Sequence, residues 1–137
     1  MRRLFADTFY WIAVLNPRDQ AHARAIALSK MLQPAQIITT DEVLIEFLNY
    51  FAERGDFQRR AAARMVERMH ADRTLHVLPQ TRDGFLTGLR LYRARPDKGY
   101  SLTDCISMEM MRREGLTEVL TDDAHFAQEG FVCLLSD

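Results

Sequence analysis

Apolar residues along the chain follow two alternating patterns, short continuous runs and longer segments with helical spacing. The short runs predict strands at residues 4–6, 36–39, 74–78, 118–120 and 131–135. The spaced segments predict helices at residues 9–15, 21–32, 43–55, 57–69, 85–92 and 102–113. The breaks between segments coincide with Pro17, Pro34, Pro79 and Gly115, residues that typically end regular structure. The chain therefore alternates strand and helix.

This alternation predicts an α/β fold. Short, continuously apolar strands are typical of a parallel sheet that is covered by helices on both faces, with right-handed crossovers. We therefore expect a three-layer α/β/α sandwich around a mostly parallel sheet of four or five strands. Residues 1–137 suffice for a single domain with its own core. In such a sheet, functional sites form beyond the carboxyl ends of the strands.

The composition is typical of a globular domain and excludes a membrane-spanning or disordered chain. Hydrophobic residues make up 47% of the sequence, yet no apolar stretch approaches the roughly 20 residues of a membrane span. Asp7 follows the first apolar run at once, so no secretory signal is predicted. Cys105 and Cys133 lack metal-ligand spacing and are interpreted as small buried thiols. We expect a cytoplasmic protein without a membrane partner.

Carboxylates follow two of the predicted strands. Asp7 ends the first apolar run, and Asp123 follows the fourth. Either residue could simply cap the next helix, since Asp is a favoured N-cap residue. Because the carboxyl ends of parallel strands meet at one edge of a sheet, two carboxylates at matching positions favour a shared site.

Two further carboxylates lie near the start of predicted helices. Thr39 and Glu42 have the spacing of a capping box, so Glu42 is assigned to the helix end. Glu46 lies one turn later, where a carboxylate gains nothing from the helix terminus, and is assigned to the site. Asp104 follows Ser101 with similar capping-box spacing, but its helix is apolar around most of its circumference. Asp104 is therefore assigned two roles, as a helix cap and as a residue of the site.

Clustered carboxylates predict a divalent cation. Ionised carboxylates raise one another's pKa unless a cation compensates, and hard oxygen donors prefer Mg²⁺ or Mn²⁺. We expect one or two such ions. The four histidines are scattered along the chain and do not fit a zinc site: His22, His70, His76 and His125. His125 is the one beside a proposed ligand, where it could contact substrate.

Four segments carry these residues: Leu4–Thr8, Thr39–Glu46, Tyr100–Ser107 and Val119–Phe126, the last containing Thr-x-Asp-x-x-Phe. Together they resemble the PIN-domain family, in particular the VapC-type toxins of bacterial toxin-antitoxin pairs. The resemblance places the family's carboxylates at Asp7, Glu46, Asp104 and Asp123. It leaves Asp122 as a spare or water-mediated ligand or a solvated residue. It also places orienting hydroxyls at Thr8 and Thr121.

The resemblance implies a metal-dependent endoribonuclease that leaves a 5′-phosphate and a 3′-hydroxyl. One or two divalent ions would activate water for in-line attack, while the carboxylates hold the ions. The resemblance also implies RNA as the substrate, a homodimer, and a small antitoxin protein that offers an arginine to the carboxylates.

The positive charge of the chain is almost entirely arginine. The formal net charge is -1, and only two of the 18 basic residues are lysines, so net charge does not identify the partner. Basic residues shortly before Asp104 are either RNA contacts or a solvated helix end: Arg90, Arg93, Arg95 and Lys98. A second basic ridge is interpreted as solvated or partner-binding: Arg60, Arg64 and Arg68.

Three other functions use a similar sheet with an acidic edge. A phosphoryl-transfer enzyme of the haloacid-dehalogenase kind would require a second Asp two residues after Asp7, where this chain has Phe9. A response-regulator receiver would require a Lys after a late strand, and neither Lys30 nor Lys98 lies there. The strongest alternative is a PIN fold that binds RNA or protein without cleaving it.

Overall fold

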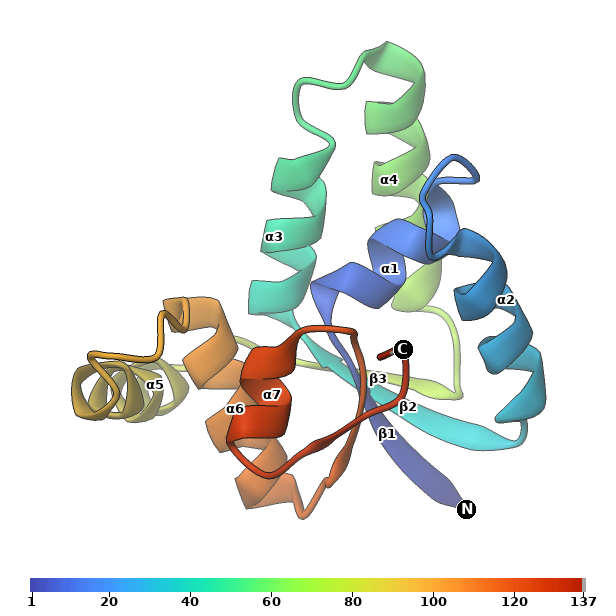
Figure 1. Cartoon of the computed structure of the whole chain (residues 1–137). Coiled ribbons are helices and arrows are strands. Elements are labelled where there is room, and N and C mark those ends of the chain that lie inside the picture. Colours follow the sequence, from blue (N-terminus) through green and yellow to red (C-terminus); the bar gives the residue numbers. More distant parts are fainter. Residues whose placement is uncertain (137) are drawn as a thin grey trace.

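The computed structural model describes residues 1–136 and contains a five-stranded sheet flanked by helices (Figure 1). The strands are β1 Arg2–Ala6, β2 Ala35–Thr40, β3 Leu75–Leu78, β4 Glu118–Leu120 and β5 Val132–Cys133. The helices are α1 Thr8–Leu15, α2 His22–Met31, α3 Asp41–Tyr50, α4 Asp56–Met69, α5 Arg82–Ala94, α6 Leu102–Glu114 and α7 Ala124–Gln128. The predicted α/β class is confirmed.

The sheet is parallel throughout, with the strand order β3-β2-β1-β4-β5. The chain builds outward from β1 through β2 and β3, then returns to add β4 and β5 on the other side of β1. Open α/β sheets bind ligands at such a change of direction, beyond the carboxyl ends of the strands. Ala6 pairs with Leu120 there, so the residues that follow β1 and β4 are neighbours.

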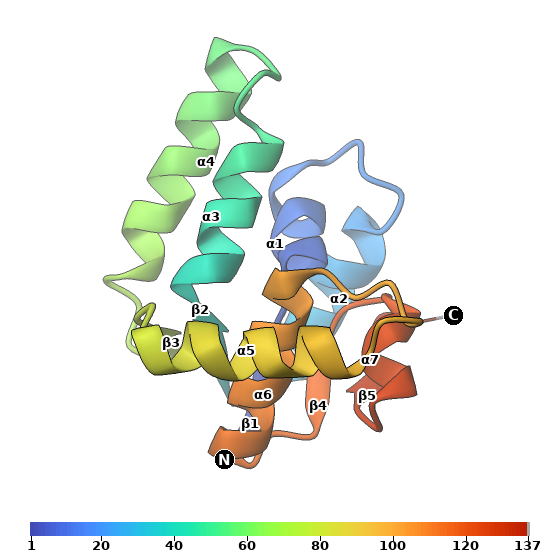
Figure 2. The ribbon, with the colours of Figure 1, turned by 90° about the vertical axis from the view of Figure 1, so that its left-hand side faces the viewer.

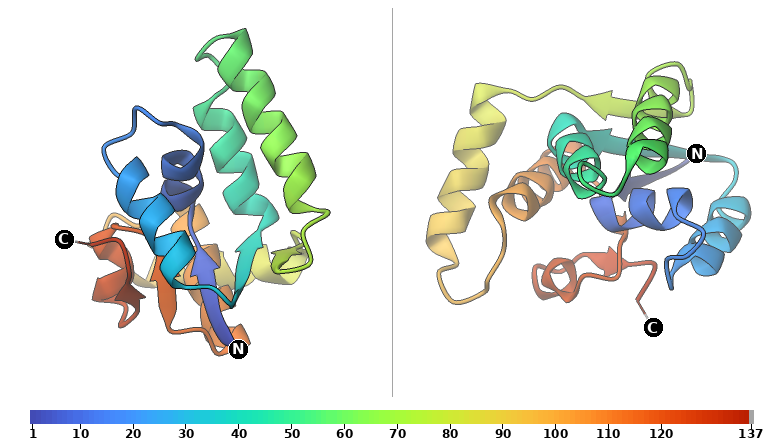
Figure 3. Two further views of the ribbon diagram at one scale, coloured as in Figure 1. Left: turned by 90° about the vertical axis from the view of Figure 1, so that its right-hand side faces the viewer. Right: turned by 90° about the horizontal axis from the view of Figure 1, so that it is seen from above.

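Helices cover both faces of the sheet, which confirms the predicted three layers. The packed pair α5 and α6 lies on one side, and α1 and α2 lie on the other (Figures 2 and 3). Helices α3 and α4 form an antiparallel pair that extends beyond the carboxyl edge of the sheet (Figure 1). This pair forms one wall above the strand ends. Within residues 1–136, no helix combines the length and apolar character needed to cross a membrane.

Helix α6 is apolar around most of its circumference because it lies between the sheet and α5. Cys105, Met108 and Met111 have no exposed surface. On its other side, α6 packs closely against Gly88 of α5, where an added Cβ would lie 2.4 Å from Cγ1 and 3.0 Å from Cα of Ile106. A residue without a side chain is therefore required for this approach. The packing fixes the position of α6, whose first turn carries Asp104.

The element boundaries differ from prediction in several places. Helix α3 ends at Tyr50 rather than near Gly55, and α5 covers residues 82–94 rather than 85–92. Strand β5 is shorter than the predicted 131–135 segment, and α7 was not predicted. Five residues are too few to display a helical period, so α7 leaves little trace in the apolar pattern. Gly115 ends α6 with a φ of 70°, as its predicted role requires.

The predicted capping box at Thr39 and Glu42 is wrong by one residue. The N-cap of α3 is Thr40, whose hydroxyl accepts a hydrogen bond from the Val43 N–H at 3.1 Å. Thr39 is fully buried, and its hydroxyl instead donates to the Ala6 carbonyl at 2.9 Å. Glu42 is thus not explained by a capping box.

The two cysteines are free, and they differ in burial. Cys105 is buried, as predicted, whereas Cys133 is only partly buried. Burial raises the pKa of the Cys105 thiol to about 11, so this side chain is a neutral part of the core. Neither cysteine forms a disulfide in the structure.

Candidate active site

One open groove lies beyond the carboxyl ends of β1 and β4. It contains every carboxylate and hydroxyl that the sequence assigns to the site: Asp7, Thr8, Glu46, Asp104, Thr121, Asp122 and Asp123. Its other lining residues are Phe9, Ile12, Tyr50 and Ser101. The fold thus brings the four predicted segments together in one place.

Asp7 occupies the N-cap position of α1, but its side chain makes no capping hydrogen bond. Its carboxylate instead accepts a hydrogen bond from the Thr121 hydroxyl at 3.1 Å. Only 6% of Asp7 is exposed. The competing interpretation of Asp7 as a helix cap therefore does not account for its side chain, which is directed to the end of β4.

The carboxylate of Asp7 is costly to ionise in this position. Its pKa is raised to about 7, mainly by burial and also by the nearby charges of Asp104 and Glu46, against the lowering effects of hydrogen bonds from Thr8 and Thr121. A carboxylate that is both buried and surrounded by other carboxylates favours either a proton or a cation. The electrostatics of the groove thus agree with a cation site.

Glu46 reaches the groove from α3, one turn after the first helical residues. Its carboxylate accepts a hydrogen bond from the hydroxyl of Thr8. Thr8 follows Asp7 directly, so this bond ties α3 to the start of α1. The structure thereby places Thr8 where an orienting hydroxyl was expected.

Asp104 combines the two roles that the sequence left open. Its carboxylate accepts a hydrogen bond from the Ser101 N–H at 3.1 Å, while the Ser101 hydroxyl accepts one from the Asp104 N–H at 3.0 Å, which completes a capping box. The same carboxylate also faces the groove. Burial and the charge of Asp123 raise its pKa, although the capping hydrogen bonds and His125 oppose the increase.

Thr121 connects the two strand ends. Its hydroxyl, which is fully buried, donates to Asp7 and accepts a hydrogen bond from the Asp123 N–H at 3.2 Å. Asp123 is partly buried and caps α7, since its carboxylate accepts a hydrogen bond from the His125 N–H at 2.9 Å. Asp122 also lines the groove but is exposed. Asp123 therefore both caps α7 and lines the groove.

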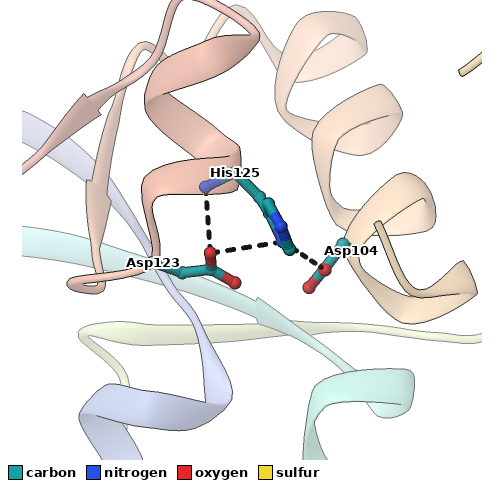
Figure 4. A group of neighbouring side chains, drawn as sticks. All are labelled: Asp104, Asp123 and His125. Carbon is teal, nitrogen blue, oxygen red and sulfur yellow. Dashed lines mark hydrogen bonds and ion pairs between the residues drawn. The ribbon is translucent and has the colours of Figure 1, made fainter. Parts of the chain in front are cut away.

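His125 lies between two of the carboxylates (Figure 4). Its Nδ1 is 3.3 Å from Asp123 Oδ1 and 3.6 Å from Asp104 Oδ2. That nitrogen is buried and has no hydrogen-bond partner among residues 1–136. Ligand atoms of all three residues lie within 4.8 Å of one another, close enough to hold one metal ion. The sequence placed His125 beside a ligand but did not predict this spacing, because α7 was not predicted.

A partly buried ion-pair network, also missed by the sequence analysis, lies behind His125. The carboxylate of Glu129, directly after α7, accepts three hydrogen bonds. The donors are the guanidinium groups of Arg95 at 3.0 Å and Arg112 at 2.6 Å, and the hydroxyl of Tyr100 at 2.8 Å. These partners outweigh burial and lower the pKa of Glu129 to about 2. The Tyr100 ring packs edge-on against His125, with centroids 5.2 Å apart. The network holds α7 against the loop that precedes Asp104.

The structure separates the basic residues that the sequence left open as RNA contacts or as a solvated helix end. Arg95 forms an ion pair with Glu129, so its charge stabilises the fold and is not free for RNA. Arg90 and Arg93 are exposed on α5, and Lys98 is exposed in the following loop. Lys98 precedes Gly99, at which an added Cβ would lie 4.0 Å from Nε2 of His125. This loop therefore borders the groove.

The basic ridge on α4 is not part of the groove. Arg60 forms an ion pair with Asp56 one turn earlier, and Arg64 and Arg68 are exposed. Arg68 lines a separate apolar groove between α1 and α4. The ridge is thus available for solvent or a partner, as the sequence analysis left open.

A parallel sheet with a carboxylate groove at the reversal of its strand order suits a carboxylate-based nuclease, but phosphoryl-transfer enzymes and receivers share this arrangement, so the comparisons decide the family. Residues 4–131 match the model of the PIN domain, and the chain therefore belongs to the PIN-domain family. The predicted resemblance to VapC-type toxins is confirmed.

The relatives agree over nearly the whole chain. The sequence is 27% identical over 129 residues to the 23S rRNA-specific endonuclease VapC20 of Mycobacterium tuberculosis, covering 94% of this chain and 95% of that one. The crystal structure of VapC20, described as a toxin that cleaves the sarcin-ricin loop, superposes with a TM-score of 0.85 at 26% identity, covering 94% and 96% of the two chains. FitAcB from Neisseria gonorrhoeae has the same fold, with a TM-score of 0.69 at 17% identity and coverage of 96% and 97%.

Proposed function

We propose that the chain is an endoribonuclease toxin that hydrolyses RNA phosphodiester bonds with Mg²⁺ or Mn²⁺, leaving 5′-phosphate and 3′-hydroxyl ends. The observation that carries this proposal is the convergence of four carboxylates in one groove: Asp7, Glu46, Asp104 and Asp123. The similarity to a 23S rRNA-specific endonuclease, whose structure is described as that of a toxin cleaving the sarcin-ricin loop, supports a loop of ribosomal RNA as the substrate. Ribosomal RNA would be met in the cytoplasm, where we expect the protein to act.

The donor set of the groove fits a divalent cation. Asp104, Asp123 and His125 would hold one ion, since their ligand atoms lie within 4.8 Å of one another. Asp7 and Glu46 would hold a second ion or share the first. Carboxylate oxygens favour Mg²⁺ and Mn²⁺, and an imidazole among them is better suited to Mn²⁺ than to Mg²⁺. Asp122, exposed beside Asp123, would act through water.

The residues around these carboxylates fix their orientation for hydrolysis. When bound, the cation lowers the pKa of a water molecule and neutralises charge on the phosphate. Thr8 holds Glu46, and Thr121 holds Asp7 together with the backbone of Asp123. The carboxylates therefore do not need to rotate far when substrate binds, which favours an oriented attack. Arg90, Arg93 and Lys98 are the proposed contacts to the RNA backbone.

Cleavage of a structured ribosomal RNA fragment tests this function. The wild type is expected to cleave with Mn²⁺ or Mg²⁺ and not after chelation, and Asp104→Asn is expected to lose about 100-fold or more of that activity. Asp83→Asn is the matched control, because Asp83 is exposed at the start of α5 and lies outside the groove. Equal cleavage by Asp104→Asn and wild type would contradict the proposal. Wild-type protein whose melting temperature does not respond to Mn²⁺ would favour the binding module.

We infer that a small antitoxin silences the nuclease. VapBC2 of Rickettsia felis, which shares the fold with a TM-score of 0.66 at 13% identity and coverage of 96% of each chain, was solved bound to a DNA fragment from its promoter. An arginine offered to the acidic groove would satisfy carboxylates that otherwise repel one another. Co-purification with the product of a neighbouring reading frame, together with inhibition of cleavage by that product, would support this partner. Cleavage unaffected by the bound product would contradict it.

We also expect a homodimer, and α5 offers an apolar surface for it. Four of its large side chains are between 36% and 50% exposed: Phe85, Leu86, Leu89 and Tyr92. Such a group on one helix is typical of an interface. Leu89→Glu is expected to shift the protein from dimer to monomer in sedimentation experiments, whereas Arg90→Glu on the same helix should leave the dimer intact. A wild-type monomer at all concentrations would contradict the expectation.

A further inference from the structure

Part of the groove is lined by apolar and aromatic side chains, and the cation site does not account for them. Phe9 and Ile12 of α1 and Tyr50 of α3 line this part. Glu46 and Tyr50 are four residues apart, so they lie one turn apart on the same face of α3. The groove thus combines carboxylates with an aromatic surface directly beside them. A nucleotide has the matching composition, a phosphate and a planar base.

Tyr50 is held in a fixed orientation. Its ring packs edge-on against Phe51, with centroids 5.0 Å apart, and Phe51 packs in the same way against Phe47 at 5.2 Å. Phe47 and Phe51 are buried, whereas Tyr50 is only partly buried. The core therefore fixes one edge of the Tyr50 ring and leaves other parts of it accessible from the groove.

Arg54 adds a cationic plane to this ring. Its guanidinium carbon lies 3.8 Å from the centroid of the Tyr50 ring, and its Nε donates a hydrogen bond to the Tyr50 carbonyl at 2.9 Å. Arg54 is exposed and forms no ion pair with a carboxylate within residues 1–136. The arginine is therefore not neutralised by the protein, although it lies near a strongly acidic groove.

We propose that Tyr50 and Arg54 form a subsite that binds one unpaired RNA base next to the scissile phosphodiester. This inference rests on the proposed ribonuclease function and adds the recognition of a base to it. Aromatic rings and arginine planes are the surfaces on which single-stranded RNA bases stack. The charge of Arg54 would in addition attract a phosphate that flanks this base. The cation that the carboxylates would hold positions the reacting phosphate, and the subsite selects RNA in which the adjacent base is splayed out of a helix.

The test compares cleavage by Tyr50→Leu, which keeps apolar volume but removes the ring, with Tyr50→Phe, which restores the ring. Stacking on an aromatic side chain contributes enough that Tyr50→Leu is expected to lose about 5- to 100-fold in kcat/KM. Tyr50→Phe is expected to recover most of this loss. Thermal melting should show that Tyr50→Leu remains folded. Wild-type kcat/KM for Tyr50→Leu would overturn the subsite.

An RNA hairpin carrying single abasic residues, one position at a time, identifies the stacked base. At one position next to the cleaved bond, removal of the base should reduce the cleavage rate of the wild-type protein as much as the Tyr50→Leu substitution does. The same abasic RNA should cause no additional loss of rate in the Tyr50→Leu protein. Equal additional losses for both proteins at every position would overturn the subsite. RNA binding followed by fluorescence anisotropy provides a readout without cleavage, in which Tyr50→Leu should bind more weakly than Tyr50→Phe. Absence of wild-type cleavage would contradict the proposed function, whereas equal binding by the two variants would contradict the subsite alone.

Discussion

Asp7→Asn is expected to lose more than about 100-fold of the cleavage activity and to stabilise the metal-free protein at the same time. Activity falls because the variant removes a negatively charged ligand from the groove. Stability rises because the buried carboxylate of Asp7, whose pKa is raised to about 7, is costly to ionise. One pKa unit corresponds to about 1.4 kcal/mol, so the free energy of unfolding should rise by up to about 4 kcal/mol at pH 8.

The pH dependence distinguishes this effect from a general change in packing. The pKa of Asp7 is higher in the folded chain than in the unfolded chain. The contribution of Asp7 to the free energy of unfolding of the metal-free wild type should therefore be most favourable at low pH. The wild type should lose this contribution as the pH rises from about 4 to about 7. Asp7→Asn should lack this decline, and added Mn²⁺ should raise its melting temperature less than that of the wild type. Parallel stability curves for the two proteins would contradict the assignment.

Glu129→Ala is expected to lower the free energy of unfolding by about 2–4 kcal/mol, because it leaves two arginines and a tyrosine hydroxyl without their shared acceptor. The side chain of Glu129 is only 6% exposed. Urea unfolding, followed by the fluorescence of the single tryptophan Trp11, measures the change. Glu118→Ala is the matched control, since its ion pair with Arg2 lies at the surface and should contribute at most about 1 kcal/mol.

Acidification provides a second measurement on the Glu129 network. The pKa of Glu129 is lower in the folded chain, so its stabilising contribution is present above pH 4.5 and is lost as the pH falls toward 2. Glu129→Ala should therefore lose less stability than the wild type over this range. An equal loss in both proteins would contradict a central role for Glu129.

The fold was predictable from the sequence because the strands and helices differ clearly in their apolar periods. The run at residues 4–6 is buried on both faces of the sheet, as a central parallel strand requires. The order of strands was not predictable, since pairing of β1 with β4 depends on contacts over more than 100 residues. Helix α7 was missed because its cap, Asp123, was also a candidate ligand and the helix is too short to show a period.

Three carboxylates of the candidate site were predictable because each follows a strand or begins a helix: Asp7, Asp104 and Asp123. Glu46 was predictable because a carboxylate inside a helix gains nothing from the helix terminus. His125 and Glu129 were not, because their partners come from other segments: Asp104 and Tyr100 precede them by about 20 to 30 residues. Arg95 illustrates the same limit. Its position in the sequence suggested an RNA contact, yet its charge is used by Glu129. Local patterns identify groups that lie at the ends of elements, whereas side-chain pairs between elements require the packed structure.

The hydrogen bonds of Thr121 to Asp7 and Asp123 have a consequence for synthesis of the protein. Strand β1 leaves the ribosome first, but its neighbour β4 and the residues that follow it are made more than 100 residues later. Until residues 118–128 have emerged, Asp7 has no partner from β4, and Asp104 has no Asp123 or His125 beside it. A chain still attached to the ribosome at that stage lacks an assembled groove.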